Sequence, residues 1–139
     1  MTLNAAPLGN AVQRLREGLA RHRREPADEQ VRDGLIQRFE FTYEISHRTL
    51  RRFLRQTAAS PDEADRMSFA ELVRAANADG LLLGDWSAWR RFRELRARSS
   101  RTDDTAAAAA VVAAIPEFLR EAEHLHAELR RRLPREPVP

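Results

Sequence analysis

Apolar side chains recur at three- and four-residue steps through nearly the whole chain, and this spacing limits the fold more than any other feature of the sequence. The steps match the 3.6-residue turn of an α-helix, so each run places its apolar residues on one helix face. No alternation of apolar and polar residues, which would indicate a strand, persists beyond a few positions. The sequence therefore predicts an all-α fold.

The periodic runs are joined by short links, which indicates an antiparallel bundle of about five helices. The expected helices cover residues 10–24, 27 or 28 to 57, a short helix after 68 that stops at the turn 77–80, a helix after 85 that stops before 99, and 104 or 105 to 133. The second and the last of these are the longest.

Several helix ends carry specific signals. Ser68 and Glu71 have the spacing of a capping box, in which each side chain binds the backbone amide of the other. Gly80 suits the left-handed position that follows a helix. Asp85 and Asp104 are the expected caps of the last two helices. The segment Ser60–Glu63 is expected to be a loop.

The chain length of 139 residues is enough for one domain with its own hydrophobic core. We expect this domain to cover residues 8–133, with flexible ends at 1–7 and 134–139. The absence of cysteine excludes disulfides, thiolate zinc sites and cysteine nucleophiles. With no long apolar run and no secretory signal pattern, we expect a cytoplasmic protein that does not enter a membrane.

All positive charge comes from arginine, since the 24 basic residues include no lysine. A GC-rich coding bias would explain this, and so would recognition of phosphate or carboxylate by guanidinium groups. The densest basic segment lies between Trp86 and Arg101 and ends beside a helix N-terminus, which favours phosphate. A solvated charged face remains the alternative. The arginines of this segment are Arg90, Arg91, Arg93, Arg96, Arg98 and Arg101, against Glu94 alone.

Little in the sequence points to a metal or a cofactor. The four histidines do not have the spacing of a metal site, and no glycine-rich phosphate loop is present. We therefore expect neither. Glu40 and Glu44 are four residues apart on the long second helix, so they share a face, and Arg48 and Arg51 are expected to pair with them.

The same long helix carries two apolar stripes. One bundle interior covers only one of them, so Phe41 or Ile45 is a candidate for a second surface. The sequence therefore predicts a homodimer in which this second stripe is covered.

The string Gln37-Arg-Phe-Glu-Phe-Thr-Tyr-Glu44, within the segment 31–44, resembles the long helix of nucleotidyltransferase substrate-binding proteins. These belong to the HEPN superfamily and include HepT-type toxins. The stretches 68–80 and 89–102 and the last helix with Ile115-Pro116 resemble the same family, so the likeness covers about residues 8–133.

The resemblance implies a HEPN-like helical bundle that dimerises and pairs with a small MNT-type nucleotidyltransferase. In HepT-like members the HEPN protein is a metal-independent ribonuclease toxin, and the nucleotidyltransferase is its antitoxin. The signature of the family is an arginine, four residues, a histidine, one residue and a tyrosine. The arginine holds the scissile phosphate, the histidine helps proton transfer, and the tyrosine is the residue that the partner modifies with AMP.

This chain matches that signature in part. Arg96 takes the arginine position, Arg101 stands at the histidine position and Asp103 at the tyrosine position, while Ala97 stands where asparagine is usual. Arginine stays protonated at neutral pH, so Arg101 does not act as a general base. The residues that the resemblance assigns to the binding cleft are Arg96, Ser100, Arg101, Thr102 and Asp103.

Three functions remain open at this point. The first is a non-catalytic HEPN-like partner of a nucleotidyltransferase in a toxin–antitoxin-type pair. The second is an active HepT-like ribonuclease with a changed motif. The third is a module that binds RNA or a nucleotide.

Overall fold

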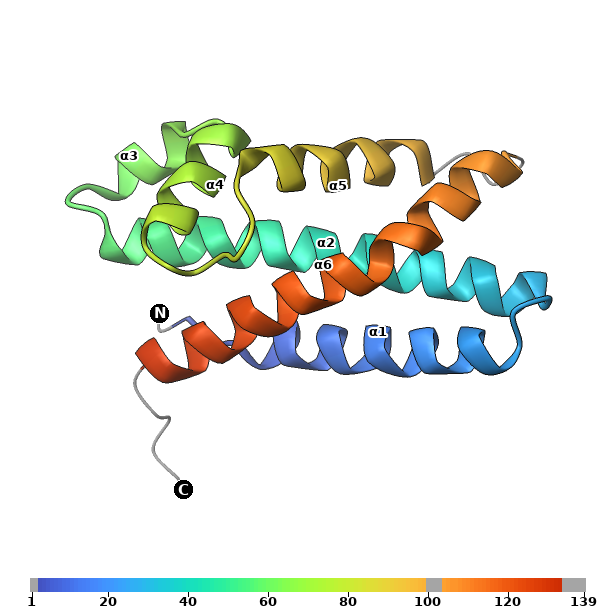
Figure 1. The fold of residues 1–139 in the computed structure, drawn as a ribbon. Helices are drawn as coiled ribbons and strands as arrows, with labels where there is room; N and C mark the ends of the chain where they lie inside the picture. Colours follow the sequence, from blue (N-terminus) through green and yellow to red (C-terminus); the bar gives the residue numbers. More distant parts are fainter. Residues whose placement is uncertain (1–2, 100–103, 134–139) are drawn as a thin grey trace, which may run out of the picture.

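The computed structural model describes residues 3–99 and 104–133, and this part of the chain is helical and contains no strand. The predicted all-α fold is thus confirmed. The helices, shown in Figure 1, are α1 (Ala6–Arg24), α2 (Glu29–Thr57), α3 (Pro61–Arg66), α4 (Phe69–Ala78), α5 (Trp86–Ser99) and α6 (Thr105–Arg132).

The helices pack around α2, the longest of them. α1 and α2 form an antiparallel hairpin, and α5 runs antiparallel to α2 along another side of it (Figure 1). α6 crosses the bundle diagonally and contacts α1, α2 and α5. The short helices α3 and α4 pack against α2, beside its C-terminal half (Figure 1).

An aromatic cluster joins the three central helices. The ring of Phe118 on α6 lies 5.0 Å from that of Phe39 on α2 and 5.3 Å from that of Phe92 on α5, both in edge-to-face geometry. Trp89 completes the cluster, with its ring 5.8 Å from Phe118. All four side chains are fully buried, so they supply both apolar area and favourable ring electrostatics.

A buried carboxylate, Glu121 on α6, fixes the loop that leads into α5. Its oxygens accept hydrogen bonds from the backbone amides of Leu83 at 3.0 Å and Gly84 at 2.8 Å, and from the indole Nε1 of Trp89 at 2.8 Å. Only 3% of Glu121 is exposed. The two consecutive amides form a nest for its charge, so α6, the loop and α5 are held together.

The predicted helix ends are confirmed at four places. Ser68 and Glu71 form the capping box, and Gly80 has a φ of 79° at the end of α4. The side chain of Asp85 accepts from the amide of Ala88 at 3.3 Å, and that of Asp104 accepts from the amide of Ala107 at 3.0 Å.

Two boundaries differ from the sequence-based prediction. The prediction of a loop at Ser60–Glu63 was wrong, because α3 begins at Pro61. Proline suits the first helical position, and Asp62 and Glu63 favour the positive end of the helix. α1 begins not near Asn10 but at Ala6, where the side chain of Asn4 accepts a hydrogen bond from the backbone amide of Ala6 at 2.9 Å.

Candidate functional site

Arg96 on α5 faces α2 and forms ion pairs with two carboxylates of that helix. Its Nη1 lies 3.3 Å from Oε2 of Glu40, and its Nη2 pairs with Oε1 of Glu44. We call this arrangement the Arg96 clasp. Because Glu40 and Glu44 are four residues apart, they share one face of α2 and present two carboxylates to one guanidinium fork.

The prediction that Glu40 and Glu44 pair with Arg48 and Arg51 was wrong, because both carboxylates pair with Arg96. Arg51 instead donates from Nη1 to the backbone carbonyls of Ala64 at 2.9 Å and Met67 at 3.0 Å. It therefore holds the end of α3 against α2. Arg48 makes no hydrogen bond or ion pair within the described part of the chain.

Carboxylates neutralise much of the basic run on α5. Arg90 pairs with Glu94 at 3.2 Å, and Arg91 pairs with Glu117 of α6. Together with Arg96, three of the five arginines in the described part of α5 have an acidic partner. Arg93 and Arg98 have none among residues 3–99 and 104–133. The uncompensated positive charge near the clasp therefore centres on Arg93.

A cavity of about 360 Å³ opens beside the clasp, between α2, α4 and α5. The ring of His47 packs on that of Phe69, with centroids 4.3 Å apart. Burial, followed by the positive charges of Arg51 and Arg93, holds the pKa of His47 below its ordinary value. The imidazole is therefore neutral at pH 7. The residues that line the cavity are Tyr43, Glu44, His47, Phe69, Arg93, Arg96 and Ala97.

Tyr43, the single tyrosine of the chain, also lines this cavity but is only 6% exposed. Burial raises its pKa to about 12, although the charges of Arg93 and Arg96 act in the opposite direction. Its phenol therefore stays protonated at pH 7 and is largely shielded from solvent.

The structure describes only part of the predicted site. Arg96 lies in the clasp, and Ala97 lies beside it. Asp104 caps α6. The remaining predicted site residues lie outside the described part of the chain; they are Ser100, Arg101, Thr102 and Asp103.

The site also contains residues that sequence reasoning missed. Arg93 and His47 reach the same cavity from α5 and α2. Their helices are distant in sequence, and only packing brings them together. In the described part of the chain, no cluster of three or more histidine, aspartate or glutamate side chains could hold a metal ion. In the same residues, no helix has an apolar stretch long enough to cross a bilayer.

Fold and site together define a helical bundle in which Arg96 is held by the carboxylates of Glu40 and Glu44. The family described as nucleotidyltransferase substrate binding protein like matches residues 3–131. The chain therefore belongs to this family, which includes the HepT-like proteins.

Two comparisons with Haemophilus influenzae proteins support this membership. A protein named probable ribonuclease HepT is 40% identical over 99 residues, which are 71% of this chain and 67% of the relative. A solved structure, described as revealing the fold of a substrate binding domain of a nucleotidyltransferase, superposes with a TM-score of 0.84 at 32% identity. That match covers 91% of this chain and 99% of the other.

Proposed function

We propose that this chain is the partner subunit of a small MNT-type nucleotidyltransferase in a toxin–antitoxin-type pair, and that it has lost ribonuclease activity. Family membership supports a nucleotidyltransferase partner. The loss of activity rests on the motif, since Arg101 and Asp103 stand where the family has histidine and tyrosine.

The Arg96 clasp is the observation that carries this proposal. Both terminal nitrogens of the motif arginine already face carboxylates, Glu40 and Glu44. A phosphate that approached Arg96 would meet two negative charges within the same contact distance, and their repulsion opposes its binding. The clasp therefore joins α5 to α2, and a phosphate binds Arg96 only when the guanidinium leaves these carboxylates.

Co-purification tests the partnership. When the chain is co-expressed with a small nucleotidyltransferase encoded beside it, an affinity tag on the enzyme is expected to retain this chain through size-exclusion chromatography. Separate elution of the two proteins at micromolar concentration would refute the partnership. A variant with Arg23→Ala and Arg24→Ala, at the exposed end of α1, controls for retention caused by net charge alone.

The chain is also expected to form a homodimer through the second stripe of α2. Phe41 is 53% exposed, and Ile45 lies one turn further along the same helix, so the two form the apolar strip that a second copy would cover. Light scattering of the wild-type chain should therefore give a particle of twice 15.9 kDa.

Phe41→Asp should convert this particle to a monomer, since it places a charge in the proposed interface. Leu83→Asp is the matched control, because Leu83 is 60% exposed but lies in the loop before α5. A wild-type monomer, or loss of the dimer in the control but not in Phe41→Asp, would contradict this interface.

An active ribonuclease is the second candidate, and His47 is the observation that favours it. This imidazole lies in the same cavity as Arg96 and is neutral at pH 7, as a general base must be. If His47 takes that role, His47→Gln abolishes metal-free RNA cleavage and leaves the helical circular dichroism spectrum unchanged. If the chain cleaves no RNA, this candidate is excluded.

A further inference from the structure

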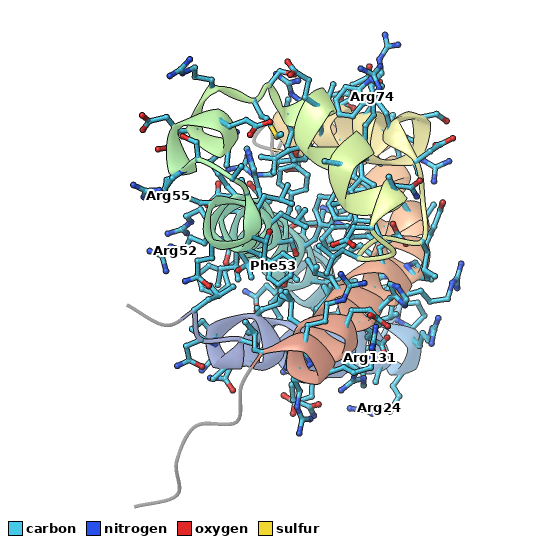
Figure 2. The ribbon with its side chains drawn as sticks, turned by 90° about the vertical axis from the view of Figure 1, so that its left-hand side faces the viewer. Arg24, Arg52, Phe53, Arg55, Arg74 and Arg131 are labelled. Atoms are coloured by element: carbon cyan, nitrogen blue, oxygen red, sulfur yellow. The ribbon has the colours of Figure 1, made fainter. Side chains whose placement is uncertain are left out.

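The C-terminal half of α2 presents a strongly basic face. Arg48, Arg52 and Arg55 follow one another at steps of four and three residues, so their side chains leave the helix on the same side. The opposite side of this segment faces the core through Thr49, Leu50 and Phe53. Figure 2 shows Arg52 and Arg55 projecting outward together, away from Phe53.

Part of this charge is without an internal partner. Arg55 lies 3.6 Å from Asp65 of α3, and Arg51 is held by the carbonyls at the end of α3. Arg48 and Arg52 form no hydrogen bond or ion pair with any residue that the structure describes. Among these four arginines, only Arg55 has a carboxylate partner within the described residues.

These side chains surround a hollow of about 250 Å³ between α2 and α3. We call it the arginine hollow, and it is lined by His47, Arg48, Arg51, Arg52, Arg55 and Asp65. His47 lines both this hollow and the cavity beside the Arg96 clasp, so the two adjoin.

The ring of His47 contacts Arg51 at the edge of the arginine hollow. Arg51 Nη2 lies 3.4 Å from its Nε2, and because arginine only donates hydrogen bonds, Nε2 accepts. The proton of the neutral ring is therefore on Nδ1, where it is a hydrogen-bond donor. The groups that set the charge around His47 are Tyr43, Glu44, Arg48 and Arg51 on α2, Asp65 on α3, and Arg93 and Arg96 on α5.

Like charges three and four residues apart destabilise a helix, and this segment repeats that arrangement between Arg48, Arg51, Arg52 and Arg55. A bound anion would remove the repulsion. We propose that the arginine hollow binds the phosphate chain of a nucleotide or an inorganic polyphosphate, at a site separate from Arg96. Guanidinium forks match the geometry of phosphate oxygens, and a hollow of this size accommodates a compact anion.

Calorimetric titration of the full chain with inorganic triphosphate at low salt tests the proposal. We expect saturable binding that the double substitution Arg48→Ala and Arg52→Ala weakens about tenfold, since each exposed charge contributes modestly. Arg51 is left intact because it holds α3. The control with Arg23→Ala and Arg24→Ala removes the same charge from the far end of the α1–α2 hairpin and should stay within about twofold of wild type.

Three further titrations identify the class of ligand and locate its binding site. Adenosine triphosphate should bind at least as tightly as inorganic triphosphate and lose affinity in the same double variant. Arg98→Ala removes an exposed arginine of α5 that has no acidic partner among the described residues, and it should leave the affinity unchanged whether or not the partnership proposed above holds. The proposal is overturned if triphosphate does not bind, if both double variants lose affinity equally, if Arg98→Ala abolishes binding, or if hexaglutamate binds as tightly as triphosphate.

Discussion

Glu121→Gln is expected to lower the free energy of unfolding by about 3 kcal/mol, because it removes the charge that accepts three hydrogen bonds and leaves at least one buried donor without an acceptor. The carboxylate accepts from two backbone amides and one indole N–H and has no room to turn toward solvent. A glutamine side chain replaces one acceptor oxygen with an NH2 group, which then faces other donors. Urea unfolding followed by circular dichroism measures the change.

Glu123→Gln is the matched control, two residues along the same helix. Glu123 is 41% exposed and pairs with Arg16 at 3.2 Å, so its substitution should change the free energy of unfolding by about 0–1 kcal/mol. If Glu121→Gln is no more destabilising than this control, the buried carboxylate does not anchor the loop before α5.

The second large effect concerns the motif. Arg101→His combined with Asp103→Tyr is expected to raise metal-free RNA cleavage by about 100-fold or more, because a positioned acid–base residue contributes about 10² to 10⁴ to the rate. Adding Arg96→Ala to this variant should remove the gain, since the motif requires its arginine. Time courses with a labelled single-stranded RNA at pH 7 measure the three rates. If the double variant cleaves RNA as slowly as the wild-type chain, the loss of activity involves more than these two positions.

The helical fold could be predicted because it depends on periodic patterns and local caps. The core positions of α2 and α6, such as Phe39 and Phe118, follow the three- and four-residue steps, and Ser68 with Glu71 marks a helix start. The short helix α3 was missed because proline and acidic residues after a serine signal a turn as well as a helix N-terminus.

The candidate site was harder to predict, because sequence spacing reveals neighbours within one helix but not between helices. Glu40 and Glu44 were identified as a pair, yet their partner Arg96 is more than 50 residues away. His47 and Arg93 also come from different helices, so sequence spacing could not predict that they line one cavity. Glu121 had a visible signal, since it lies three residues after Phe118 and four before Leu125 on the apolar side of α6.

The most direct test of the proposed loss of activity is RNA cleavage by the wild-type chain in the presence of a metal chelator. The account predicts a rate no higher than that of buffer, which Arg96→Ala leaves unchanged. Chelator-resistant cleavage by the wild-type chain that Arg96→Ala abolishes would contradict it, and would show that the clasped arginine still serves a working ribonuclease.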